Sequence, residues 1–281
     1  MGKHEAQQLL GDRLTLPTLP EVVTKLTAMI NDSKVGLHEI GAVVAQDAAI
    51  TAKVLRIANS SYYGLKEPVL SAEQAATVVG ARSLRNIALQ ASVFARYEHL
   101  ASLPDFDLNA VWRHAIYVAQ LAQTLARESR RPLGLGAEEF YTCGLLHDIG
   151  KVVMLENLGP QYVAVVQEGK RAHQAVHLVE ARVLGFTHVD VGSLVASRWK
   201  LPEAVAKSIE FHHGPQYEVL ATPAVAVVAV ADQIAYRAEL PAATASLDRL
   251  ADFAQKALGV EAPQFEHLLA YAREIEGLIE V

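Results

Sequence analysis

The segment Phe140–Lys151 reads FYTCGLLHDIGK and joins an apolar run to an adjacent histidine and aspartate. Small and apolar residues fill most of the stretch before His147, which is typical of a helix buried in a core. Ile149 and Gly150 follow at once, and the glycine predicts that the helix ends beside the His147–Asp148 pair. Two neighbouring polar side chains at a helix end can point at one centre. The segment therefore predicts a helical core that carries a polar site.

The same periodicity extends from this segment in both directions. Apolar residues recur three and four positions apart along almost the whole chain, and no sustained alternation indicates a strand. An all-α fold is therefore expected. Helices are predicted over residues 21–30, 36–45, 48–59, 71–79, 81–97, 108–130, 137–149, 160–169, 174–184, 188–198, 202–213, 222–239, 245–257 and 263–279.

A polar interruption divides the helical pattern into two parts. The stretch EHLASLPDFD, residues 98–107, breaks the periodicity with a proline and several acidic residues. At 281 residues, of which 51% are hydrophobic, the chain is long enough to bury two helical cores. We therefore predict an N-terminal helical domain over residues 1–105 and a C-terminal helical domain over residues 106–281.

Charge and apolar run length narrow the class of protein. A formal net charge of -6 disfavours a protein that wraps nucleic acid, because such proteins normally present a basic face. The single cysteine, Cys143, excludes an intramolecular disulfide and stands among apolar residues, as a core residue does. The N-terminus has no apolar signal segment, and the longest apolar run, residues 223–231, is about half of what a membrane-spanning helix needs. A cytoplasmic protein with no membrane segment is therefore expected.

Seven side chains of metal-ligand types lie in apolar helical segments of the predicted C-terminal domain. Imidazole and carboxylate groups hold paired divalent metals in hydrolases. Asp232 stands in AVAVVAVADQIA, where burial of an unpaired carboxylate costs several kcal/mol, so it needs a cation, a hydrogen-bond network or exposure. The chain therefore carries either a metal site or the ligand residues of a metal site that has lost its ion. The candidates are His114, His147, Asp148, His188, His212, His213 and Asp232.

Each candidate also has a purely structural interpretation. The His147–Asp148 pair can form a hydrogen bond at a helix C-terminus, and the His212–His213 pair before a Gly-Pro turn can lie on the surface. His114 and His188 can each be a satisfied core or cap histidine. His173 and His177 lie one helical turn apart but have no third ligand nearby. They and the remaining histidines are assigned no role, namely His4, His38, His99, His173, His177 and His267.

The candidates belong to longer phrases that resemble a known family. The phrases are LPTLPEVVTKL (16–26), VVAQDAAITAKVLRIANSSYYG (43–64), VVGARSLRNIAL (78–89), GLLHDIGK (144–151), EARVLGFTHVDVGSLVASRWKLPEAV (180–205) and IEFHHGP (209–215). Together they resemble the HDOD family, the "HD-related output domain" of bacterial signalling proteins within the HD and HD-GYP phosphohydrolase superfamily. The resemblance covers nearly the whole chain and implies an HDOD-specific N-terminal domain followed by an HD-like helical bundle.

The resemblance also implies a ligand set for two divalent ions, drawn from Fe, Mn, Mg, Ni or Zn. By that analogy Asp148 bridges both ions and, if the protein is an enzyme, acts in catalysis with Lys151, which can meet a phosphate oxygen as a point charge. The remaining ligands divide into two groups, His114, His147 and Asp232 on one ion and His188, His212 and His213 on the other.

Two departures from the HD-GYP enzymes bear on activity. Ala110 stands where some of those enzymes carry a glutamate for an additional metal, and HHGPQYEVLATPAV (212–225) replaces the loop that leads to their Gly-Tyr-Pro sequence. The family resemblance implies a non-catalytic signalling module that acts through protein contacts, with a receiver or sensor domain as the kind of partner. The alternative is a metal-dependent phosphohydrolase acting on a nucleotide or a small phosphodiester, which the complete ligand set favours.

Overall fold

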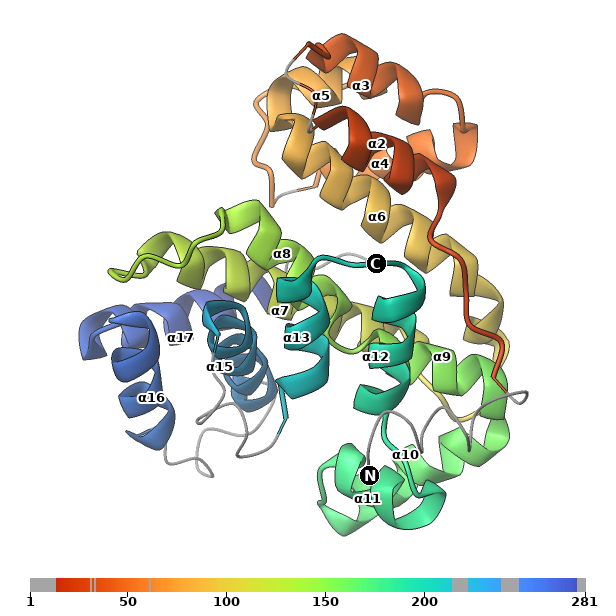
Figure 1. Cartoon of the computed structure of the whole chain (residues 1–281), viewed down its shortest axis with the longest axis vertical. Helices are drawn as coiled ribbons and strands as arrows, with labels where there is room; N and C mark the ends of the chain where they lie inside the picture. The colour runs from red at the N-terminus through yellow and green to blue at the C-terminus, as the bar shows by residue number, and fades with distance from the viewer. Residues whose placement is uncertain are drawn as a thin grey trace. The chain divides into compact units, whose positions relative to one another are not determined.

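The computed structural model describes residues 14–30, 32, 34–60, 62–213, 222–238 and 248–276. Within these ranges the regular structure is helical and contains no strand, which confirms the predicted all-α fold. No helix in the described ranges is long and apolar enough to cross a bilayer. The chain divides into two compact units (Figure 1), a smaller one over residues 19–99 and a larger one formed by residues 14–18 and 100–276.

The smaller unit is a compact group of helices around its own apolar core. Its helices begin where the sequence supplies caps, since Asp47 accepts hydrogen bonds from two backbone N–H groups and Ser71 accepts one from Gln74. Leu26, Val44 and Leu84 are fully buried in the core. The helices are α2 (Glu21–Ile30), α3 (Leu37–Val44), α4 (Ala48–Ala58), α5 (Ala72–Val79) and α6 (Ala81–Tyr97), followed by the 3₁₀ turn η1 (Glu98–Ser102).

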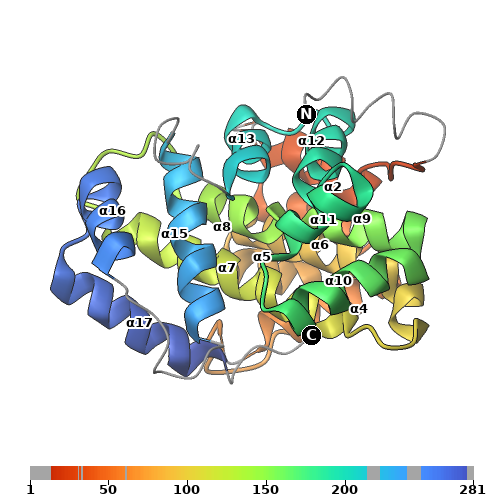
Figure 2. The same ribbon diagram turned by 90° about the horizontal axis from the view of Figure 1, so that it is seen from below.

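The larger unit is a helical bundle whose longest member is α7. Helices α8 and α15 pack against α7, and α12 packs between α9 and α13. Figures 1 and 2 show α16 and α17 beside α15 at one side of this unit. Its helices are α7 (Leu108–Glu128), α8 (Ala137–Leu146), α9 (Ile149–Leu158), α10 (Pro160–Ala172), α11 (Val176–Leu184), α12 (His188–Arg198), α13 (Glu203–Phe211), α15 (Pro223–Ala238), α16 (Asp248–Leu258) and α17 (Ala262–Glu276).

The predicted helix over residues 137–149 is wrong at its end, because α8 stops at Leu146 and a separate helix, α9, begins at Ile149. Gly150 lies inside α9 and does not terminate a helix. A Cβ atom at Gly150 would lie 1.8 Å from the carbonyl oxygen of His188, so the glycine permits the close crossing of α9 and α12. Packing, and not helix termination, therefore accounts for this glycine.

The other predicted helices correspond to observed ones, with ends shifted by a few residues. Residues 245–247 and 277–279 of the two last predictions, and residues 214–221 of the segment that replaces the Gly-Tyr-Pro loop, lie outside the described residues.

Cys143 is fully buried in α8, and burial raises the pKa of its thiol to about 12. This environment agrees with the interpretation of Cys143 as a core residue.

Candidate metal centre

The seven predicted ligand side chains meet in the larger unit. They come from five places in the bundle, namely the first turns of α7, the junction of α8 and α9, the start of α12, the end of α13 and the middle of α15. Their ligand atoms form two groups, each with all its atoms within 4.8 Å of one another. The first group is Asp148, His188, His212 and His213, and the second is His114, His147 and Asp232.

The local sequence explains how several of these side chains are placed. His147 and Asp148 occupy the break between α8 and α9, where the chain turns without either residue inside a regular helix. Thr187 caps α12 through a capping box with Asp190, so the helix starts at His188 and directs that ring into the bundle. The crossing at Gly150 then brings α9 and α12 close enough for Asp148 and His188 to face each other.

Backbone carbonyl groups set the tautomers of two histidines. Nδ1 of His147 lies 2.7 Å from the carbonyl oxygen of Gly144, and Nδ1 of His212 lies 2.9 Å from that of Ile209. Because a carbonyl oxygen only accepts hydrogen bonds, each Nδ1 carries the proton and donates it. In the neutral ring, the lone pair of Nε2 is therefore available to a cation.

Glu180 sets the tautomer of His188 in the same way. The sequence alone did not single out this residue. Oε2 of Glu180 accepts hydrogen bonds from Nδ1 and the backbone N–H of His188, and Oε1 accepts one from the hydroxyl of Tyr162 at 2.7 Å. Burial alone raises the pKa of Glu180, but His188 beside it lowers that pKa to about 2. The signal available in the sequence was a charged residue adjoining the apolar positions Val176 and Val179 of α11.

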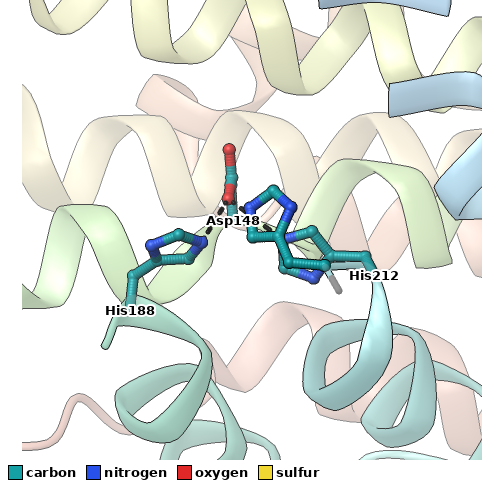
Figure 3. A group of neighbouring side chains, drawn as sticks. Asp148, His188 and His212 are labelled. Carbon is teal, nitrogen blue, oxygen red and sulfur yellow. Dashed lines mark ion pairs between the residues drawn. The ribbon is translucent and has the colours of Figure 1, made fainter. Parts of the chain in front are cut away.

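Four buried atoms around Asp148 have no hydrogen-bond partner in the part of the chain that the structure describes. They are Oδ1 of Asp148 and the Nε2 atoms of His147, His188 and His212. Figure 3 shows the rings of His188 and His212 directed at the Asp148 carboxylate, with Nε2 to Oδ1 separations of 3.3 and 3.4 Å. A nitrogen lone pair facing a carboxylate oxygen is repulsive, so the arrangement requires a proton or a metal cation between them.

The spacing of these atoms fits a divalent ion. Two ligand atoms held about 2.1 Å from one ion at tetrahedral angles lie roughly 3.4 Å apart. The separations from Oδ1 of Asp148 to the Nε2 atoms of His188 and His212 agree with that value. The donor set of imidazole nitrogen and carboxylate oxygen is also that of divalent transition metals. The residues present therefore fit such an ion.

The second group is already linked by internal contacts. Nε2 of His114 lies 3.0 Å from Oδ1 of Asp232, and Nε2 of His147 lies 3.3 Å from Oδ2 of Asp148. The ammonium group of Lys151, predicted to contact a phosphate oxygen, lies 2.5 Å from the same Oδ2 atom. Lys151 is therefore paired with a carboxylate of the centre in this structure.

The pKa values of the centre reflect the need for a cation. Burial lowers the pKa of His147, but the adjacent Asp148 carboxylate outweighs it and raises the pKa to about 10. Burial raises the pKa of Asp148, whereas His147 and Lys151 hold it well below its usual range. Burial also raises the pKa of Asp232, but the hydrogen bonds to His114 and His147 outweigh it and hold that pKa well below its usual range. In the absence of metal, a proton on His147 thus stabilises the buried carboxylates.

His177 also lies at the centre, although the sequence analysis assigned it no role. Its ring stacks on that of His213, with ring centroids 4.4 Å apart and an interplanar angle of 21°. Burial, and then the neighbouring His212, lowers the pKa of His213, so that ring is neutral. Nothing in the spacing of His173 and His177 indicated this contact, because it joins α11 to the end of α13.

Residues 16–215 match the family described as "HDOD domain". The fold is similar to that of an HDOD domain protein of unknown function from Geobacter sulfurreducens, with a TM-score of 0.80 and 25% identity over 99% of this chain and 98% of that one. A protein from Shewanella amazonensis, provisionally described as a phosphohydrolase, has a TM-score of 0.74 and 25% identity, covering 99% of this chain and 97% of its own.

Two curated proteins are similar to shorter parts of the chain. An uncharacterized protein from Treponema pallidum is 26% identical over 205 residues, which are 73% of this chain and 39% of that protein. Ribonuclease Y from Fervidobacterium nodosum is 31% identical over 124 residues, which are 44% of this chain and 18% of the ribonuclease. The chain thus spans less than half the length of these curated relatives.

Proposed function

Because the chain belongs to the HDOD domain family, we propose that it is a cytoplasmic regulatory module that acts through protein contacts and binds a divalent metal ion without hydrolysing phosphodiesters. Its partner is a protein of a bacterial signalling pathway, of the receiver or sensor type. The metal-binding bundle is the larger unit, and the ion has a structural or sensory role there. The proposal concerns this chain alone, since the curated relatives are much longer.

One observation carries the metal-binding part of the proposal. The Nε2 atoms of His147, His188 and His212 are buried around Asp148 and lack hydrogen-bond partners among the described residues. A buried polar atom without a partner costs about 1–3 kcal/mol, so several of them around one carboxylate are best explained by a bound cation. Because imidazole supplies five of the seven candidate ligands, the ion is Fe²⁺, Mn²⁺, Ni²⁺ or Zn²⁺ in preference to Mg²⁺, which prefers oxygen.

Three features support a regulatory role over turnover. Ala110 provides no ligand for an additional metal, and residues 214–221 do not carry the substrate loop of the HD-GYP enzymes. The Lys151 ammonium is paired with Asp148 instead of being directed at a substrate. An anion entering the centre would therefore have to compete with Asp148 for the lysine.

A second candidate function, metal-dependent hydrolysis of a nucleotide or small phosphodiester, is favoured by the complete set of seven ligand side chains. The similarity to a ribonuclease and to a protein provisionally described as a phosphohydrolase points the same way. Bound divalent ions polarise a phosphate and activate water. In that case Asp148 would orient the centre and Lys151 would neutralise a phosphate oxygen.

Metal analysis and hydrolysis assays on one preparation test the proposal. The purified chain is stripped with a chelator, reloaded with Mn²⁺, Fe²⁺ or Zn²⁺, and its metal content is measured. It is then incubated with a chromogenic phosphodiester, a cyclic dinucleotide and RNA. We expect bound metal and no turnover.

Turnover that is lost in Asp148→Ala and kept in the control Asp252→Ala, an exposed aspartate of α16, would establish the second candidate function instead. A chain that takes up none of the three metals would contradict the proposed metal site.

A further inference from the structure

The two oxygen atoms of Asp148 have different surroundings. Oδ1 faces the Nε2 atoms of His188 and His212 and has no hydrogen-bond partner in the described ranges. Oδ2 accepts a hydrogen bond from the Lys151 ammonium at 2.5 Å. One side of the carboxylate is therefore open to a cation, and the other side already holds one.

The open side is organised to receive an ion without breaking any contact. The donor bonds of His188 to Glu180 and of His212 to a backbone carbonyl leave both Nε2 atoms directed inward. His213 completes the group, with its ring stacked on His177. Since the orientation and tautomer of His188 and His212 are set in advance, little conformational freedom is lost in these two rings when an ion enters.

The opposite side is largely occupied by internal contacts, although Nε2 of His147 has no hydrogen-bond partner among the described residues. His114 is hydrogen-bonded to Asp232 through Nε2, the atom that it would offer to a metal. Lys151 neutralises Oδ2 of Asp148, the oxygen on the side of His114 and His147. An ion on this side would have to replace the His114–Asp232 hydrogen bond and displace the ammonium group, and both replacements cost binding free energy.

We infer that the centre, if it binds metal as proposed above, holds a single ion in its resting state. The ligands of this ion are Asp148, His188, His212 and His213. Lys151 occupies the second cation position as a built-in substitute for a metal. The second group, His114, His147 and Asp232, takes up an ion only when the Lys151 ammonium leaves Asp148. The resting protein is thus mononuclear although it carries ligands for two ions.

Titration of the metal-free chain with MnCl₂ tests this inference. For the unmodified chain we expect one tightly bound Mn²⁺ by calorimetry and the electron paramagnetic resonance signal of an isolated ion. In Lys151→Met we expect the dissociation constant of a second Mn²⁺ to fall at least about tenfold, with the signal of a spin-coupled pair, because the competing ammonium is gone. Lys207→Met, which removes a half-exposed lysine of α13 that pairs with Glu203 instead of a ligand, is the matched control.

Two ligand variants test the order of filling independently of Lys151. His212→Ala should abolish tight binding of the first ion, whereas His114→Ala should leave it within about twofold, because His114 belongs to the second group. Circular dichroism melting confirms that each variant is folded. These two variants decide the matter even if Lys151→Met does not fold.

Equal binding of two ions by the unmodified chain would overturn the inference, as would equal effects of His212→Ala and His114→Ala. An unchanged second dissociation constant in a folded Lys151→Met chain would overturn it too. All three results leave the proposed metal binding intact. Failure of the unmodified chain to bind Mn²⁺, Fe²⁺ or Zn²⁺ would contradict the proposed function itself.

Discussion

Glu180 receives two hydrogen bonds from His188 on a single oxygen, 2.8 Å from the backbone nitrogen and 2.7 Å from Nδ1. Both residues are almost completely buried, so water does not replace either bond. The carboxylate therefore fixes the start of α12 and the tautomer of a candidate ligand at the same time. A glutamate from α11, outside the predicted ligand set, controls how the centre presents His188.

Replacement of Glu180 should weaken metal binding. In Glu180→Ala, His188 loses the acceptor that orients it, and removal of such a partner lowers metal affinity by about 10- to 100-fold. Competition with a chromogenic chelator measures the affinity for Zn²⁺ or Mn²⁺. Glu180→Gln should recover part of the affinity because its amide oxygen still accepts from Nδ1, and unchanged affinity in Glu180→Ala would refute the orienting role.

Gly150→Ala should destabilise the larger unit. The added Cβ would lie 1.8 Å from the carbonyl oxygen of His188, so α9 and α12 must separate. Forced overpacking of this kind costs about 1–3 kcal/mol, and here the obstructing atom is backbone, which places the expected loss at the upper end. Urea unfolding gives the free energy change. Gly36→Ala is the control, since its Cβ has no neighbour nearer than 3.8 Å, and equal stability of the two variants would contradict the crossing.

The metal-free chain should lose stability on both sides of a pH window. Asp148 has a pKa lowered from 3.8, so its contribution is present above that pH and is lost as the pH falls. The pKa of His147 is raised from 6.5 to about 10, so its contribution is present below pH 6.5 and declines as the pH rises toward 10. Maximum stability is therefore expected between about pH 4 and 6.5.

Thermal melts of chelator-treated protein from acid to alkaline pH would show this window. His147→Gln should remove the alkaline decline, whereas His38→Gln, at an exposed residue of α3, should keep it. A decline of the same size in both variants would assign the effect to groups other than His147.

Addition of metal should stabilise the larger unit. At a free ion concentration of one hundred times the dissociation constant, binding to the folded state alone contributes about 2.7 kcal/mol. Asp148→Asn should remove most of this gain, because Oδ1 of Asp148 faces both His188 and His212. The melting temperature with and without MnCl₂ measures the effect. A shift of full size in Asp148→Asn would place the ion elsewhere in the chain.

Local sequence signals accounted for most of the helices. Asp47 and Ser71 act as helix caps in the structure, and the helices predicted over residues 48–59 and 71–79 begin at or next to them. These signals act within one or two turns of a helix, where backbone hydrogen bonds and side-chain caps involve neighbours in the chain. Helix starts can therefore be predicted from these residues without knowledge of the fold.

The sequence by itself determined the helical class and predicted the seven side chains that the structure brings together, since histidines and aspartates stood out within apolar helices and within phrases that resemble the HDOD family. Only the tertiary structure decided that Gly150 permits a helix crossing, that Glu180 orients His188, and that His177 stacks on His213. It also decided that the two sides of Asp148 differ, because Lys151 pairs with only one oxygen. Such relations join separate helices or depend on individual atoms, and a one-dimensional pattern contains neither packing distances nor hydrogen-bond directions.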